Sequence, residues 1–103
     1  MKEMLERLRV ADPETWAQIN FLSRTASGFD IDKNPNKVDQ DYIQGCIQRA
    51  IAARWDVSGI TLIHIGNKYK AAIRYKSTFR FDGEGDSWAM ALLAAYLEAL
   101  DAH

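Results

Sequence analysis

Apolar residues recur at helical spacing in the first part of the chain. Met1, Leu5 and Leu8 predict a short first helix. The tripeptide Asp12-Pro13-Glu14 then offers an N-cap side chain, a preset backbone angle and a carboxylate near the positive end of a helix dipole. It predicts a second helix over residues 13–27, with Gly28 available to end it. The apolar stripe of this helix is Trp16, Ile19, Leu22 and Ala26.

A longer helical pattern covers residues 37–55 and predicts a third helix. Its buried stripe is expected to contain Val38, Tyr42, Ile43, Cys46, Ile47, Ala50 and Ile51. Gln44, Gln48 and Arg49 lie between these positions and are expected to face water. An amphipathic helix of this kind needs an apolar surface to pack against.

The period then changes to two, which predicts β-structure over residues 58–81. Gly66-Asn67 tolerates positive backbone φ angles and predicts the turn of a hairpin. One face of the second segment carries Tyr69, Ala71, Ile73, Tyr75, Phe79 and Phe81, and the other carries Lys68, Lys70, Arg74, Lys76 and Arg80. The alternation runs through Ser77-Thr78 without Gly, Pro or Asn. We therefore favour one long bent strand over two strands joined by a turn.

The last predicted helix follows the glycine-rich DGEGDS and has Asp86 or Ser87 as its N-cap. It carries no charge from Trp88 to Leu97. A helix that is apolar on nearly every side needs a cover on each face. The N-terminal helices or a second subunit could provide the second cover, so we expect a homodimer. Pairing of edge strands across a two-fold axis would also enlarge a small sheet.

These elements predict an α+β fold in a single domain over residues 1–103. Residues 1–28 form its N-terminal helical segment, and residues 37–101 form a helix-hairpin-helix core. The hairpin is expected to pack on the third and last helices, with the N-terminal helices closing the outer side. A chain of 103 residues has room for one modest core.

Charge and cysteine content narrow the functional classes. The net charge of -1 gives no overall attraction to nucleic acid or to an anionic membrane. A single cysteine, Cys46, cannot form an internal disulfide, and the charged first residues differ from a signal peptide. No apolar run reaches the roughly 18 residues that span a bilayer. We expect a cytoplasmic location.

The segment DIDKNPNKVDQD, residues 30–41, has oxygen ligands at the spacing of a calcium loop: Asp30, Asp32, Asn34, Asn36 and Asp41. Pro35 stands where such a loop needs glycine, and Lys37 replaces an apolar anchor. We therefore interpret the segment as a turn in which Asn36 or Asp39 caps the third helix. In the second acidic segment, DGEGD at 82–86, we expect the glycines to allow the chain to reverse from strand to helix. No metal and no cofactor are expected.

Candidates for catalysis are few. Cys46, His64 and His103 are the soft or titratable side chains, and none has a partner at a catalytic spacing. Cys46 lies on the apolar stripe of the third predicted helix, and His64 alternates with Ile63 and Ile65. We therefore expect a buried cysteine, a histidine on the sheet and no enzymatic activity.

The basic row along the second β segment could contact phosphates. The end of the chain also resembles a double-stranded-RNA-binding domain, through Gly83, Gly85, Ser87, Ala91, Ala95, Ala99 and Leu100. That resemblance implies an αβββα unit whose last helix grips phosphate with lysines. Those places hold Trp88, Ala89 and Leu92 here. Nucleic-acid binding is therefore the alternative function rather than the favoured one.

A second resemblance covers residues 36–100. The closing GDSWAMALLAAYLEAL is similar to the turn and the Ala- and Leu-rich helix of small tailed-phage accessory proteins of the ABA-sandwich type. It implies a phage or prophage protein that acts in the host cytoplasm by stoichiometric contact with a host or phage protein, for example to block a defence system. We expect the partner to contact Lys68, Lys70, Arg74, Lys76, Arg80, Asp82 and Glu84.

Overall fold

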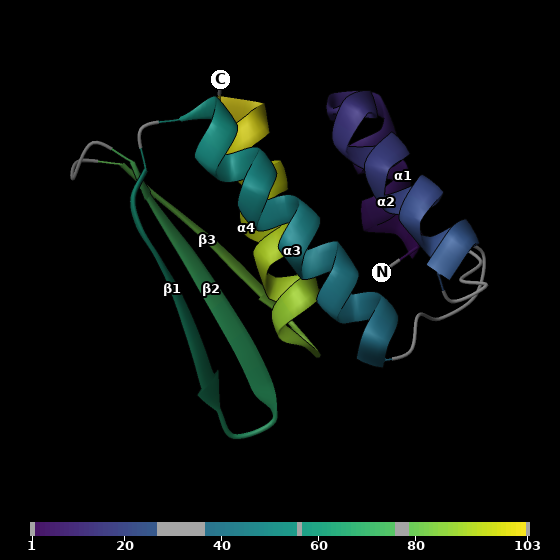
Figure 1. The fold of residues 1–103 in the computed structure, drawn as a ribbon. Helices are drawn as coiled ribbons and strands as arrows, with labels where there is room; N and C mark the ends of the chain where they lie inside the picture. Colours follow the sequence, from purple (N-terminus) through teal and green to yellow (C-terminus); the bar gives the residue numbers. More distant parts are fainter. Residues whose placement is uncertain (1, 27–36, 56, 76–78, 103) are drawn as a thin grey trace.

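The computed structural model describes residues 2–26, 37–55, 57–75 and 79–102. Helices α1 (Lys2–Ala11) and α2 (Pro13–Ala26) lie side by side at one end of the molecule (Figure 1). Asp12 is the only residue between them: its amide donates to the carbonyl of Leu8 at 2.7 Å, and its own carbonyl accepts from the amide of Trp16 at 3.1 Å. The predicted start of α2 at Pro13 is confirmed. Of its predicted stripe, Ile19 is buried and Trp16 is half-buried, whereas the side chains of Leu22 and Ala26 lie outside the described part.

Helix α3 (Lys37–Arg54) follows the predicted range closely. Ile43, Cys46, Ile47 and Ile51 are fully buried, and Ala50 is half-buried. The prediction for Tyr42 is wrong, because its side chain is 41% exposed. Successive helical residues are about 100° apart, so Tyr42 lies at the border of the stripe that Ile43 begins. Gln44 and Gln48 are half-buried rather than fully exposed, and the side chain of Val38 is not among those described.

The β-structure is a three-stranded antiparallel sheet in the order β1-β2-β3. Its strands are β1 (Val57–Ile65), β2 (Lys68–Tyr75) and β3 (Phe79–Gly85). Gly66 has a φ of 61° in the turn between β1 and β2, as the Gly66-Asn67 pattern predicted. The expectation of one long bent strand is wrong, since Tyr75 pairs with Phe79 across two antiparallel strands. These residues are four apart, an even number, so the alternation of faces continues unchanged from one strand to the next.

The glycine-rich segment after Phe81 is part of β3 and not the loop expected from its composition. Gly83 and Gly85 lie on the face that meets helix α4 (Trp88–Ala102). A Cβ atom on Gly83 would overlap the carbonyl oxygen of Ala91 and the amide nitrogen of Ala95, and one on Gly85 would lie 2.6 Å from the Cβ of Met90. These glycines allow α4 to pack directly on the strand backbone.

Helix α4 begins at Trp88, where the predicted cap Ser87 accepts a hydrogen bond from the amide of Met90 at 3.2 Å. It lies on β3 and β2 with one side and meets α3 and α1 with the other (Figure 1). Its fully buried residues are Ala89, Ala91, Leu92, Leu93, Ala95, Tyr96, Leu97 and Ala99. The chain itself therefore covers both faces of the uncharged part of this helix, from Trp88 to Leu97, and a second subunit is not needed for that purpose.

The layers are the sheet, then α4 with α3, then α1 with α2 (Figure 1). The class is α+β, as predicted. Helix α3 packs mainly against α4 and α2, so α4 supplies the closest helical contact with the sheet. Among the described ranges, no helix combines the length and the hydrophobicity that crossing a membrane requires.

Candidate functional site: the open face of the sheet

The side of the sheet that faces away from α4 is here called the open face. Side chains alternate along a strand, and residues paired across antiparallel strands share a face. The register therefore assigns to the open face Thr61, Ile63 and Ile65 of β1, Lys68, Lys70, Ala72 and Arg74 of β2, and Arg80, Asp82 and Glu84 of β3. All three described strands contribute to it.

Six of the predicted contact residues come together on this surface. Lys68, Lys70, Arg74, Arg80, Asp82 and Glu84 are all exposed there, whereas Lys76 lies outside the described residues. The glycine-rich composition of DGEGD predicts that the two acids lie in a loop beyond the strand. They instead alternate with glycines along β3 and stand directly opposite the basic strand, with Asp82 paired to Ala72 and Glu84 to Lys70.

The apolar part of the open face was missed by sequence reasoning. Thr61 pairs with Ala72, and Ile63 pairs with Lys70, so β1 adds an apolar border to the basic row. Ile63 and Ile65 are 42% and 60% exposed. The sequence does contain a signal for this apolar border. The two-residue turn at Gly66-Asn67 fixes the register of the hairpin, in which Ile65 pairs with Lys68.

The open face contains a hollow of about 440 Å³. Its lining includes Thr61, Ile63, Lys70, Ala72, Arg80 and Asp82, with Glu84 at its border. Ala72 forms the floor: it is the smallest side chain in the centre of the face and is only 5% exposed. The hollow thus has an apolar base and a rim that carries charges of both signs.

The charges on and next to the open face are incompletely paired within the described residues. Arg80 Nε donates to Asp82 Oδ1 at 2.8 Å, and Lys68 Nζ lies 3.8 Å from Asp86 Oδ1 just beyond the strand. Arg74 stands opposite Arg80 across the strands and has no ion pair with a described residue. Like charges in directly opposed positions destabilise a sheet, and exposed ion pairs add little stability. This arrangement therefore does not serve to stabilise the sheet.

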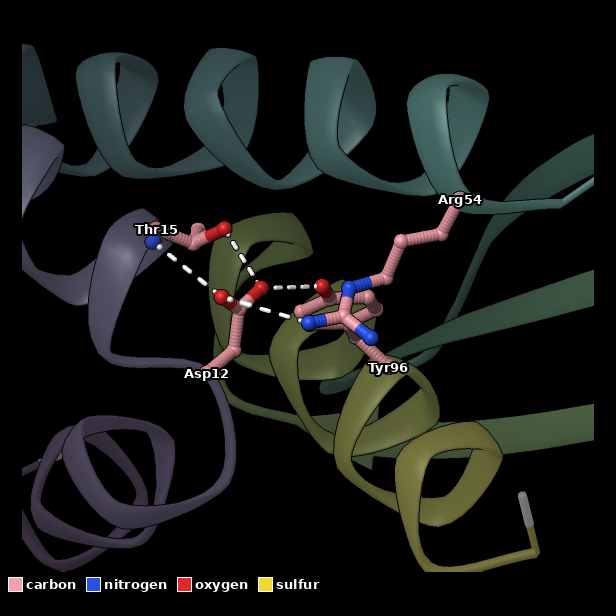
Figure 2. A network of polar contacts seen from close by, with 4 residues as sticks. All are labelled: Asp12, Thr15, Arg54 and Tyr96. Atoms are coloured by element: carbon pink, nitrogen blue, oxygen red, sulfur yellow. Dashed lines mark hydrogen bonds and ion pairs between the residues drawn. The ribbon is translucent and has the colours of Figure 1, made fainter.

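A second polar cluster lies inside the helical side of the molecule (Figure 2). Asp12 Oδ2 accepts hydrogen bonds from Thr15 Oγ1 at 2.6 Å and from the Tyr96 hydroxyl at 2.5 Å, while Oδ1 accepts from the Thr15 amide at 3.3 Å. Arg54 Nη2 lies 3.5 Å from Oδ1. These side chains come from α2, α3, α4 and the α1–α2 junction, so one carboxylate joins four helices.

The carboxylate at the centre of this cluster is buried and fully paired, which indicates a structural role, and Arg54 reaches it from a partly exposed position. Burial alone raises the pKa of Asp12, but the hydrogen bonds from Thr15 and Tyr96 and the charge of Arg54 outweigh it and hold that pKa below its usual value. Burial and the neighbouring carboxylate raise the pKa of Tyr96 well above that of a free tyrosine. No buried side-chain nitrogen or oxygen in the described part of the chain lacks a hydrogen-bond partner.

The possible catalytic residues are dispersed. Cys46 is fully buried in α3, where Arg49 Nη2 lies 3.4 Å from its Sγ, and burial raises the pKa of its thiol despite that arginine. His64 is exposed near the end of β1 and stacks on Tyr69, with ring centroids 4.2 Å apart. His103 lies outside the described residues. The two described candidates thus have separate neighbours and do not form a nucleophile–base pair.

The predicted turn at 30–41 falls mostly outside the described residues, which include only its last part in α3. Asp41 is exposed on that helix. Within residues 2–26, 37–55, 57–75 and 79–102, no three His, Cys, Asp or Glu side chains form a group that could hold a metal ion. The calcium-loop positions at residues 30–36 lie outside the described residues.

An aromatic cluster marks the end of the sheet near the start of α4. Tyr69 packs edge to face on Trp88 with centroids 5.3 Å apart, and a hollow of about 390 Å³ borders them together with Gln40 and Gln44 of α3. Trp88 remains 43% exposed. This hollow has fewer charged side chains than the open face, which is therefore the stronger candidate for specific recognition.

Comparison of the chain with family models, with curated proteins and with solved structures finds no significant match.

Proposed function

We propose that the protein is a non-enzymatic binding protein that contacts another protein stoichiometrically through the open face of its sheet. The observation that carries the proposal is the hollow of about 440 Å³, with Ala72 as its floor and charged residues of both signs around it. Protein-binding surfaces combine an apolar centre that excludes water with a polar rim that fixes orientation. The open face has both parts.

The charges on this face favour a protein over nucleic acid. A phosphate placed on Arg80 would compete with Asp82, which already accepts the hydrogen bond from its guanidinium. A phosphate near Lys70 would approach Glu84, which stands directly opposite on β3. The aromatic residues Tyr69, Tyr75 and Phe81 lie on the helical side of the sheet, so bases could not stack between the cations.

The expected partner presents an apolar side chain next to a carboxylate. The apolar group would enter the hollow over Ala72, and the carboxylate would meet Arg74, whose charge no described residue neutralises by an ion pair. Charge-assisted hydrogen bonds of this type orient a partner on the surface. A phage or prophage origin and a target in a host defence system remain predictions from the sequence resemblance.

Affinity capture tests the proposed surface. Arg74→Glu should abolish 1:1 capture of a protein partner from the cells in which the chain is expressed, because it reverses the unpaired charge. Arg7→Glu on α1 is the matched control, since Arg7 is exposed and has only a weak surface ion pair with Asp101. Capture that survives Arg74→Glu and also the hollow-filling Ala72→Leu would contradict the proposed surface.

Nucleic-acid binding is tested separately by fluorescence anisotropy. We expect no binding tighter than about 10 µM to duplex RNA, duplex DNA or single strands at about 150 mM salt. Submicromolar binding that weakens steeply with salt and falls further in Lys70→Ala and Arg74→Ala would instead support the alternative, a nucleic-acid-binding module. Each phosphate contact that is lost would then reduce the salt dependence by about one unit of slope.

A further inference from the structure

The two edges of the sheet differ in how they are protected against pairing with another strand. Strand β3 carries Arg80, Asp82 and Glu84, and α4 packs closely on its backbone. Strand β1 runs over nine residues, VSGITLIHI, without a charged side chain or a proline. Lysines, prolines, short lengths and β-bulges are among the features by which proteins keep edge strands from pairing. Strand β1 has only one of these, an irregular register between Val57 and Gly59 at its beginning, and it is regular from Gly59 to Ile65.

Strand β1 also lies at the edge of the sheet that the helices cover least. Helix α4 lies on β2 and β3, and Figure 1 shows β1 as the strand farthest from α1 and α2. Thr61, Ile63 and Ile65 project from its open face and are all exposed. Among the described residues β1 pairs only with β2, so the other edge of this nine-residue strand presents unpaired backbone groups over roughly 30 Å. Such an edge can accept one further antiparallel strand.

The strand is complementary to itself. In an antiparallel pair of identical strands, the two-fold axis passes beside one residue, and residues at equal distances on either side of it face each other. An axis at Thr61 places Gly59 opposite Ile63 of the second copy. Apart from Gly59 and its two chain neighbours, no heavy atom of the described residues lies within 4 Å of the place where a Cβ of Gly59 would stand. The exposed Ile63 therefore finds open space, and no charge within β1 meets a like charge.

We propose that β1 pairs antiparallel with β1 of a second copy about a two-fold axis at Thr61, which joins two sheets of three strands into a single sheet of six. The axis is perpendicular to the sheet, so both open faces lie on the same side and form one continuous surface. The contact is small, so its dissociation constant should be roughly micromolar. This dimer does not depend on the partner proposed for the open face.

Charged substitutions at Thr61 test the position of the two-fold axis, and sedimentation measures the resulting self-association. Thr61→Lys and Thr61→Glu each place two like charges directly opposite each other and should weaken self-association roughly tenfold at low salt. An equimolar mixture of the two variants should dimerise again, because each Lys then meets a Glu. Val10→Lys is the matched control, since Val10 is 85% exposed on α1 and its replacement should leave the dimer unchanged.

Engineered cysteines test the register. Thr61→Cys should form a disulfide-linked dimer on mild oxidation, whereas Ile63→Cys should not, because two residues at position 63 would be too far apart across the axis. The native Cys46 is fully buried and should not interfere. A wild-type chain that stays monomeric up to about 200 µM, or a mixture of Lys and Glu variants that does not reassociate, would overturn the proposal. Equal cross-linking at positions 61 and 63 would indicate a parallel arrangement and would overturn it as well.

Discussion

The helical side of the sheet and its open face use polar and small residues in opposite ways. On the helical side, Gly83 and Gly85 leave no space between strand and helix. Asp12 accepts hydrogen bonds from Thr15 and Tyr96 and forms an ion pair with Arg54. On the open face, Ala72 leaves a hollow, and Arg74 has no ion pair with a described residue. Close packing and complete pairing indicate a structural role, and open space beside unpaired charge indicates recognition.

This contrast predicts different effects for substitutions on the two sides of the sheet. Changes on the helical side should reduce the free energy of unfolding, and changes on the open face should alter binding at nearly constant stability. Four predictions test the separation, each by chemical unfolding followed by circular dichroism.

Gly83→Ala should have the largest effect, a loss of about 3 kcal/mol or failure to fold, because the added Cβ overlaps backbone atoms of α4 that cannot move alone. Gly45→Ala is the control. A Cβ on Gly45 would lie 3.7 Å from Arg49 Nη1, and alanine is favoured over glycine in a helix by up to about 1 kcal/mol. Equal stabilities of the two variants would contradict the close approach of α4 to β3.

Asp12→Ala should destabilise the protein by about 2 kcal/mol, because the change removes the N-cap of α2 and leaves the buried Tyr96 hydroxyl without its acceptor. Glu14→Ala, in the same first turn but exposed, should cost at most about 1 kcal/mol. If the two substitutions had similar effects, the cluster in Figure 2 would not contribute beyond the helix dipole.

Acidification should remove part of the stability that the Asp12 carboxylate contributes to the fold. The pKa of Asp12 is lower in the folded protein than in the unfolded chain, so its carboxylate stabilises the fold above the unfolded pKa of about 4, and this stability is lost as the pH falls through the folded value. The difference in unfolding free energy between the wild type and Asp12→Asn should therefore shrink on acidification. A difference that stays constant from neutral pH to about pH 2 would contradict the assignment.

The smallest effect is expected on the open face. Arg80→Ala and Asp82→Ala should each change stability by less than about 0.5 kcal/mol, because their ion pair is exposed to solvent. A loss above about 1 kcal/mol from either change would mean that the open face is part of the structural framework.

Structural features that depend on neighbouring residues could be predicted from the sequence. Asp12-Pro13 begins α2, Ser87 caps α4 and Gly66 occupies the hairpin turn, because each depends on residues within one turn of the chain. The basic row on β2 could be predicted for the same reason. The turn between β2 and β3 could not be predicted, because the even separation between Tyr75 and Phe79 preserves the alternation of apolar and charged residues.

Features that depend on tertiary contacts were harder to predict. Glycines in DGEGD suggest a loop, but the reason for Gly83 is a helix whose contact residues follow later in the chain. The hollow requires β1, β2 and β3 in register, so neither Ala72 nor Ile63 is conspicuous in the linear pattern. The ion pair of Asp12 with Arg54 and its hydrogen bond with Tyr96 likewise join segments that are distant in sequence.

The carboxylate of Asp12 also has a consequence for the order in which the chain is completed during synthesis. Translation produces Asp12 early, yet its hydrogen-bond donor Tyr96 is 84 residues further on. The contact of Asp12 with α4 cannot form until α4 has left the ribosome, and contacts between such distant residues slow folding. Helices α1 and α2 are thus synthesised well before the helix that completes the hydrogen bonds of Asp12.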